Sequence, residues 1–258
     1  MLLCPVCHEP LVDDERGAAC AGGHRFDRAR EGYLYLLRSS KSGDSMGDPK
    51  SQARSRRDFL NRGYYAPLRD AMVELVDAYG FDLGKEMVRL AAKRGDATYF
   101  VANMKDIPVA DGAFDMVTEL FAPFNEREFA RVLVPEGSLY TVVPGARHLF
   151  GLKEVLYDTP YLNDEKLPQT TELELVGTQR VSANITLQTQ ADIEAVFQMT
   201  PYYYRTRPAD IDFIIAEYRH KPTKKGQVCF GRFCLGKRKG PTAEMRDRPF
   251  LVAWLQRL

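Results

Sequence analysis

Four residues near the start of the sequence have the types and the spacing of a metal site. Three cysteines and a histidine follow the pattern C-x2-C-x12-C-x3-H, formed by Cys4, Cys7, Cys20 and His24. Zinc prefers thiolate and imidazole ligands, and two ligands separated by two residues form half of a tetrahedral site. Between the pairs, Asp13, Asp14 and Gly17 provide turn chemistry for a short hairpin. The pattern predicts zinc bound by all four residues, a structural site because no coordination position stays open.

Two other interpretations of these residues remain open. His8 is adjacent to a ligand and can replace one of the four. The cysteines can also form disulfides, but the residues from Met1 to Pro5 carry neither the charged nor the apolar region of a secretion signal. We therefore expect a cytoplasmic protein. Cys229 and Cys234 have no second pair of ligands nearby, so we expect no metal there.

The basic residues are clustered, although 36 Lys and Arg nearly balance 35 Asp and Glu. Between Lys50 and Arg69 only Asp58 opposes them, and between Lys221 and Gly240 there is no acid. Such clusters can follow a phosphate backbone, or they can be a solvated helix face or a loose tail. A chain of 258 residues, 45% hydrophobic, indicates one large globular domain or two small ones. No apolar run approaches the roughly 18 residues of a membrane span.

The residues after the first cluster alternate between helical and strand patterns. Helices are predicted over 50–63, 68–79, 85–93 and 126–133, and strands over 98–102, 114–121 and 138–143. Such alternation indicates an α/β fold with a mostly parallel, doubly wound sheet. Ligands of these sheets bind beyond the carboxyl ends of the strands. The residues found there are Asp82, Asn103, Phe121-Ala122-Pro123 and Pro144-Gly145.

Motifs between residues 4 and 217 resemble those of the 23S ribosomal RNA guanine-N1 methyltransferases, class I enzymes that use S-adenosylmethionine and carry an N-terminal zinc-binding domain. Besides the Cys/His pattern, the motifs are Phe26-Asp27 with Glu31-Gly32-Tyr33, Arg57-Asp58-Phe59-Leu60, Gly63-Tyr64-Tyr65-Ala66-Pro67-Leu68, Pro144-Gly145-Ala146-Arg147-His148-Leu149 and Gln198-Met199-Thr200-Pro201-Tyr202. They occur in the order of the family. The resemblance implies a Rossmann-like methyltransferase domain, 23S rRNA as substrate, and a homodimer.

The resemblance also assigns roles to individual residues. It implies that Tyr65 and His148 contact the cofactor and that Asp82 accepts hydrogen bonds from the ribose hydroxyls, a bidentate pairing suited to a carboxylate. Asn103 then lies beside the adenine, and Phe121 lies next to the methyl donor and the target base. The residues expected to bind the RNA are Arg54, Arg56, Arg57 and Arg62.

One motif of the family is missing. The glycine-rich loop after the first strand, similar to Asp-x-Gly-x-Gly-x-Gly, has no counterpart, and the helical pattern through Glu74–Tyr79 leads directly into Gly80-Phe81-Asp82. We therefore expect a sheet that lacks its first, central strand. The expected organisation is a zinc-binding domain (1–38), a linker (39–49), a methyltransferase domain with a deletion near residue 80 (50–217), and an atypical basic tail (218–258).

Two functions are consistent with these observations. The first is methylation of a guanine N1 in 23S rRNA, and the alternative is a catalytically decayed zinc-bearing protein that binds RNA without the cofactor. The proton on N1 requires a base, and Glu119 is the nearest acid to Phe121, although it can equally be an ordinary charge at a strand end. Tyr202, Tyr203 and Tyr204 can offer a stacking surface for RNA bases or face the core.

Overall fold

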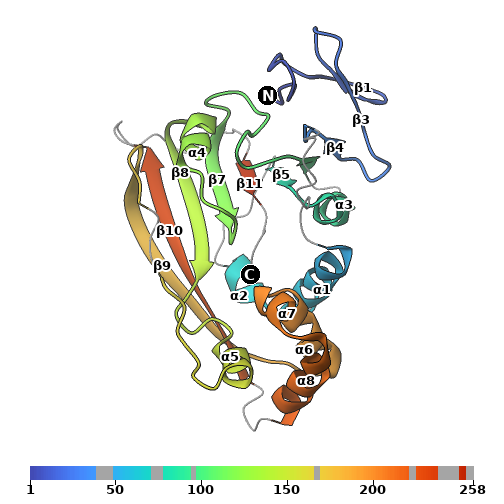
Figure 1. Ribbon diagram of the computed structural model, residues 1–258. Helices are drawn as coiled ribbons and strands as arrows, with labels where there is room; N and C mark the ends of the chain where they lie inside the picture. Colours follow the sequence, from blue (N-terminus) through green and yellow to red (C-terminus); the bar gives the residue numbers. More distant parts are fainter. Residues whose placement is uncertain are drawn as a thin grey trace.

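The computed structural model describes residues 1–38, 49–70, 78–93, 97–165, 169–220, 225–237 and 250–253 (Figure 1). Its first elements are β1 (Val12–Asp14), β2 (Gly17–Ala19), β3 (Arg25–Asp27), β4 (Leu34–Tyr35), α1 (Lys50–Asn61), α2 (Ala66–Asp70), β5 (Ala78–Asp82), α3 (Lys85–Ala92) and β6 (Thr98–Val101). The next are β7 (Phe114–Leu120), α4 (Glu126–Val132), β8 (Leu133–Pro144), α5 (Phe150–Leu156) and β9 (Leu173–Thr186). The last are α6 (Gln190–Gln198), α7 (Pro201–Arg205), α8 (Ile211–His220), β10 (Lys225–Lys237) and β11 (Phe250–Ala253).

The main sheet is mixed, and its parallel part holds the predicted site residues. In the described part of the chain it has eight strands in the order β4-β6-β5-β11-β7-β8-β10-β9. The strands from β4 to β8 are parallel, and β10 and β9 continue the sheet in antiparallel fashion. Strands such as β6 and β7 are almost continuously buried, as expected for parallel strands covered on both faces. The α/β fold predicted from the alternating pattern is therefore confirmed.

The central position of this sheet is filled by a strand that the sequence did not identify. Strand β11 pairs in parallel with β5 on one side and with β7 on the other, with Leu251 opposite Tyr79 and Val117. The Leu251 side chain is fully buried in the core. The position in which the family resemblance places the first strand is thus occupied by residues from much later in the chain. The expectation of a sheet with its central strand missing is corrected by this pairing.

The segment expected to be a basic tail also contributes to the sheet. Strand β10 pairs with β8 from Phe230 opposite Pro144 to Gly236 opposite Ser138, and with β9 along its whole length. Its two short apolar runs, Val228-Cys229-Phe230 and Phe233-Cys234-Leu235, suit a strand better than the tail that the surrounding lysines indicated. Both β10 and β11 pair with strands of the main sheet, so the segment expected to be a separate tail over 218–258 contributes two strands to the main domain.

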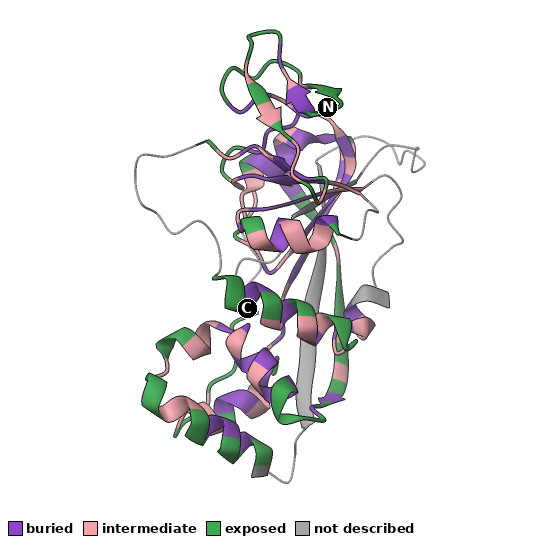
Figure 2. Ribbon diagram, turned by 90° about the vertical axis from the view of Figure 1, so that its right-hand side faces the viewer, coloured by how far each residue is buried: buried purple, intermediate pink, exposed green. Residues whose placement is uncertain are grey.

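The N-terminal segment forms a small sheet, β1-β2-β3, and is attached to the main sheet at two places. Leu2 forms a bridge with Val109, and the Leu3 N–H donates to the Pro108 carbonyl at 2.8 Å. Strand β4 pairs in parallel with β6, so Leu34, within the zinc-binding domain expected over residues 1–38, belongs to the main sheet. Figure 2 shows that the outer loops of this segment are exposed, whereas the strands beneath it are mainly buried.

Helices α1 and α6–α8 lie together at the opposite end of the molecule (Figure 1). Helix α6 begins with a capping box, in which the Thr189 and Asp192 side chains accept each other's backbone N–H groups. Asp192 also pairs with Arg62, which connects the end of α1 to α6. Helix α2 covers only part of the predicted helix at 68–79, whose residues 71–77 lie outside the described residues, as does the linker except Pro49. No helix in the described part of the chain is long and apolar enough to cross a membrane.

Candidate functional site

The four predicted metal ligands converge at the N-terminal segment. The ligand atoms of Cys4, Cys7, Cys20 and His24 all lie within 4.8 Å of one another. The Cys7 and Cys20 sulfurs are 3.6 Å apart, and the Cys20 sulfur is 3.4 Å from His24 Nδ1. A tetrahedral zinc ion with usual bond lengths separates two sulfurs by about 3.8 Å and a sulfur and a nitrogen by about 3.6 Å. The donor set and its size therefore fit Zn²⁺.

The structure shows neither of the two alternatives for these residues, a disulfide bond or His8 as a ligand. All three cysteines are free, and the distance between Cys7 and Cys20 is far longer than the roughly 2.05 Å of a disulfide bond. His8 lies outside the cluster, with an exposed side chain and a left-handed backbone (φ 61°). The zinc ligands predicted from the spacing are thus the ones that the fold brings together.

The local backbone explains how the two ligand pairs meet. Asp14 accepts hydrogen bonds from the N–H groups of Arg16 and Gly17, which closes the turn between β1 and β2 as predicted. Gly22 lies directly beside the ligands, because a Cβ atom on this residue would be 3.4 Å from the Cys7 sulfur, in van der Waals contact with it. Burial alone would raise the pKa of Cys20, but hydrogen bonds from His24 and the other thiols lower that pKa to about 6. A low pKa favours the thiolate that zinc binds.

The remaining predicted residues follow the ends of the parallel strands, along what we call the carboxyl edge of the sheet. Asp82 ends β5 and is 4% exposed, and its carboxylate accepts a hydrogen bond from the Gly84 N–H at 2.5 Å. Asn103 follows the neighbouring strand β6, and its side-chain oxygen accepts from the Lys105 N–H at 3.0 Å. The two strand ends are joined because the Ala102 N–H donates to the Asp82 carbonyl at 3.2 Å.

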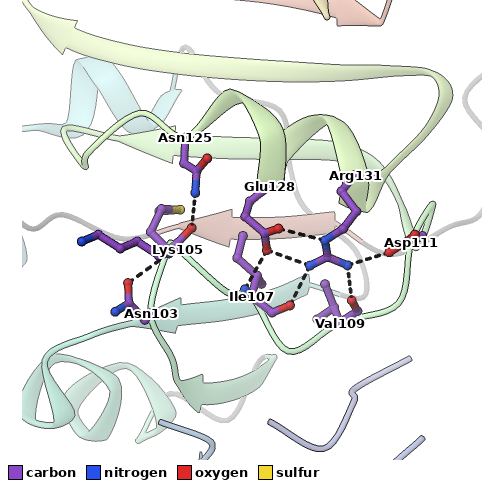
Figure 3. Close-up of polar contacts among 9 residues, drawn as sticks. Asn103, Lys105, Ile107, Val109, Asp111, Asn125, Glu128 and Arg131 are labelled. Atoms are coloured by element: carbon purple, nitrogen blue, oxygen red, sulfur yellow. Dashed lines mark hydrogen bonds and ion pairs between the residues drawn. The ribbon is translucent and has the colours of Figure 1, made fainter. Parts of the chain in front are cut away.

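Helix α4 fixes the loop that carries Asn103 (Figure 3). The Asn125 amide donates to the Met104 carbonyl at 2.8 Å. Further along, Glu128 accepts from the Ile107 N–H at 2.8 Å. The guanidinium of Arg131 pairs with Glu128 and Asp111 and donates to two backbone carbonyls of the loop. These contacts hold the loop after β6 against the start of α4.

A second group of predicted residues meets beyond β7 and β8. The Tyr65 hydroxyl and His148 Nε2 form a buried hydrogen bond of 3.0 Å, and the His148 ring lies 6.0 Å from the ring of Phe121. All three side chains are at most 5% exposed. Phe121 directly follows β7 in a left-handed conformation (φ 54°), which turns the chain sharply at the carboxyl edge. Burial raises the pKa of Tyr65, so its hydroxyl stays neutral. We call Tyr65, Phe121 and His148 the aromatic cluster.

The structure does not bring every predicted residue into one cluster. Asp82 and Asn103 lie on the β5 and β6 side of β11, whereas the aromatic cluster lies on the β7 and β8 side. All five share the carboxyl edge, and the end of β11 at Ala253 lies between the two groups. Five residues follow in the sequence, Trp254-Leu255-Gln256-Arg257-Leu258, without a glycine.

Glu119 is buried within the sheet. Its side chain is 2% exposed and accepts hydrogen bonds from the Thr141 hydroxyl and from the Ala122 N–H. Burial raises the pKa of this carboxyl from 4.5 to about 7, because the two hydrogen bonds only partly offset the loss of hydration. Through Ala122, Glu119 supports the backbone turn at Phe121.

The predicted RNA-binding arginines separate into exposed and buried residues. Arg54 and Arg57 are exposed on α1, each near a carboxylate, and Arg62 pairs with Asp192. Arg56 is fully buried, so the expectation that it faces RNA is wrong in this conformation. Ala53, Arg56 and Phe59 recur at a spacing of three and lie on the inner face of the helix, and this spacing is the signal in the sequence that could have revealed the burial. Among the three tyrosines, Tyr203 packs on Phe197, while Tyr204 is 48% exposed.

The fold is that of a class I methyltransferase with a zinc-binding N-terminal segment. Residues 2–41 match the family model described as RlmA, N-terminal, and residues 62–141 match the one described as methyltransferase domain. A Streptomyces fradiae protein named 23S rRNA (guanine(748)-N(1))-methyltransferase is 30% identical, over 84% of this chain and 90% of its own. The Bacillus subtilis protein YxjB, named "Putative 23S rRNA (guanine-N(1)-)-methyltransferase", is 30% identical, over 62% of this chain and 70% of its own. The chain belongs to the 23S rRNA guanine-N1 methyltransferase family.

The methyltransferase domain implies S-adenosylmethionine as cofactor, and the residues present fit it only in part. The buried carboxylate of Asp82, at the end of β5, suits the ribose hydroxyls of an adenosine. The glycine-rich loop has no counterpart, since nowhere in the sequence are two glycines separated by a single residue. A carboxylate suited to the adenosine ribose is therefore present, whereas the loop that lets the backbone approach the cofactor has no counterpart in the sequence.

Proposed function

We propose that the protein methylates N1 of a guanine in 23S rRNA, with S-adenosylmethionine as methyl donor. The observation that carries the proposal is the buried aromatic cluster at the carboxyl edge. Tyr65, Phe121 and His148 come from three separate parts of the chain, yet the fold brings both Tyr65 and Phe121 close to the His148 ring. The family membership of the chain supports the same reaction.

The roles of the residues follow from their positions. Asp82 would hold the adenosine ribose, and Phe121 would form the wall against which the target base lies. The bound cofactor supplies a methyl group that is open to attack by nitrogen. Alignment of donor and base is the main contribution that such residues make to the rate, and it can be worth several kcal/mol. The Tyr65–His148 hydrogen bond fixes the orientation of the imidazole within this wall.

Glu119 has a pKa suited to a general base near neutral pH. Its two carboxylate oxygens, however, accept hydrogen bonds from Thr141 and Ala122 inside the sheet. These contacts favour a role in holding the turn at Phe121 over removal of the guanine proton.

A second function is favoured by one specific observation, the absence of the glycine-rich loop from the sequence. Without that loop the protein would retain its zinc segment and the exposed Arg54 and Arg57, and it would bind rRNA without transferring a methyl group. This is the function of a catalytically decayed relative.

Two measurements on the intact protein separate these functions. Calorimetric titration with S-adenosylmethionine tests cofactor binding, and transfer of a labelled methyl group to 23S rRNA tests the reaction. Because a methyl group on N1 blocks base pairing, primer extension should stop at the modified guanine. Micromolar binding with such a stop would support the methyltransferase. The absence of heat and of a stop, in protein that holds one zinc ion and binds the RNA, would establish the second function instead.

A further inference from the structure

A buried lysine lies behind the loop that carries His148. Lys153, on α5, is fully buried, and its ammonium group donates to the Asn163 side-chain oxygen at 2.6 Å and to the Tyr161 carbonyl at 3.0 Å. The ammonium nitrogen also lies 4.0 Å from the centroid of the Tyr161 ring and 5.9 Å from that of Tyr202. Among the described residues, all of these contacts are with neutral groups. A buried charge is costly without a carboxylate partner, so its presence here calls for an explanation beyond packing.

The partner of this lysine holds the loop directly. The Asn163 amide donates to the Gly145 carbonyl at 2.9 Å and to the His148 carbonyl at 3.3 Å. The Asn163 backbone N–H donates to the Ala146 carbonyl at 2.9 Å. A charged donor at the Asn163 oxygen orients the amide, so its nitrogen faces the loop carbonyls.

The same loop is constrained at its other polar positions. Glu165 accepts from the Ala146 N–H at 2.8 Å and pairs with Arg180. Leu149, directly after His148, has a left-handed backbone (φ 51°), a conformation that persists only when its surroundings fix it. The segment around Asn163 therefore determines where the His148 backbone lies, and hence whether the imidazole meets Tyr65.

We propose that Lys153 is a positioning residue that acts through Asn163, holding the 144–149 loop so that His148 meets Tyr65 in the aromatic cluster. The proposal rests on the proposed function for its effect on methyl transfer. The arrangement itself can be tested without activity. The hydrogen bonds of Lys153 go to Tyr161 and Asn163 and not to a residue of the aromatic cluster, so its effect on the reaction passes through the loop.

The decisive variant is Asn163→Asp. It keeps an oxygen that accepts from Lys153 and replaces the neutral amide by a carboxylate, so the contact with Lys153 is retained or strengthened. It removes the nitrogen that donates to Gly145 and His148. A purely structural lysine would tolerate this change, whereas a positioning lysine would lose its connection to the loop. Lys153→Met, which removes the charge at similar volume, is the complementary variant, and Lys93→Met, at an exposed lysine, is the control.

The chain contains four histidines, so ¹⁵N-histidine labelling gives a spectrum in which His148 can be assigned by a His148→Gln variant. We expect Asn163→Asp and Lys153→Met to shift or broaden the His148 imidazole signals and to change their pH titration, while Lys93→Met leaves them unchanged. His148 signals and titration identical to the parent protein in folded Asn163→Asp would overturn the proposal. If Lys153→Met fails to fold, the Asn163→Asp result decides alone.

Kinetics provide the second measurement. Misplacement of the cluster should lower kcat for methyl transfer by roughly tenfold to a hundredfold, with KM for the RNA unchanged, because no RNA contact is removed. A change confined to KM would contradict the positioning role. If the parent protein transfers no methyl group, the proposed function fails, and the histidine spectra still decide whether Lys153 positions the loop.

Discussion

The functional residues of this protein differ in whether their local sequence reveals their role. The zinc ligands were predicted from spacing, because a C-x2-C pair imposes its geometry locally. Tyr65 and His148 were identified only through the family resemblance, since they are 83 positions apart and neither has a local pattern. Lys153 and Asn163 gave no signal, because the buried ammonium and its amide partner become meaningful only when α5 folds back on the following segment.

At this scale the first prediction concerns Glu119 and pH. Its pKa is raised from 4.5 to about 7, so between these values the folded protein binds more protons at this site than the unfolded chain. Stability therefore falls as pH rises through this window, by an amount on the order of 3 kcal/mol. Glu119→Gln cannot lose a proton. Its amide oxygen can still accept from the Ala122 N–H, and its amide nitrogen can donate to the Thr141 hydroxyl oxygen in place of the bond that the carboxylate accepts, so we expect the variant to be more stable than the parent above pH 7. Urea unfolding between pH 5 and 8 measures this, and parallel pH profiles for the two proteins would refute it.

A second prediction at the residue scale concerns Arg54 and Arg57. Both are exposed on α1, and a phosphate contact contributes roughly 0.7 to 0.9 to the slope of log affinity against log salt concentration. The double variant Arg54→Ala, Arg57→Ala should bind 23S rRNA more weakly and with a shallower salt dependence. Filter binding at several salt concentrations measures both, with Arg127→Ala, an exposed arginine on α4, as control. An unchanged slope would exclude phosphate contacts by these two residues.

The elements between residues 85 and 144 were predicted well, because each strand and helix there has a strong local period. Strand β11 was not predicted from the sequence. Its four residues carry no information on which strands they will join, and the two partners lie far away in sequence. Strand β10 was taken for a basic tail, because the lysines around it outweighed its two short apolar runs.

The prediction at this scale tests the central strand. Leu251 is fully buried between β5 and β7, and truncation of a buried leucine to alanine typically costs 2–5 kcal/mol. We expect Leu251→Ala to lower the free energy of unfolding by roughly that amount. Leu175→Ala, on β9 and 44% exposed, is the matched control and should cost far less. Equal effects of the two substitutions in chemical denaturation would mean that β11 does not occupy the centre of the sheet.

On the scale of the whole molecule, the zinc segment and the main sheet are connected rather than independent. Leu2 and Ala18 pack in the same core as Phe100 and Val117. The chain around Leu3 is bonded to the loop after β6, the same loop that carries Asn103. The metal site therefore supports one end of the carboxyl edge, although it is remote from the aromatic cluster.

This connection predicts that loss of zinc destabilises the adjacent part of the main sheet. Cys7→Ala should reduce the bound zinc below one per chain and destabilise the N-terminal segment, whereas His8→Ala should leave the zinc content unchanged. Removal of zinc by a chelator should also increase hydrogen exchange at residues 98–110, which β4 and Leu3 cover. Elemental analysis and exchange mass spectrometry provide the measurements. Full zinc content in Cys7→Ala would reject the four-ligand assignment.

The parallel insertion of β11 also sets the order in which the protein can be assembled. Strands β5 and β7 leave the ribosome long before residues 250–253, and until those residues emerge no described strand pairs with both β5 and β7 to close the sheet. Contacts of such high sequence separation slow folding and leave strand edges exposed during synthesis. In the growing chain the strand edges of β5 and β7 that face β11 therefore stay unpaired until the last strand is made. Translation arrest before β11 should leave a polypeptide prone to aggregation.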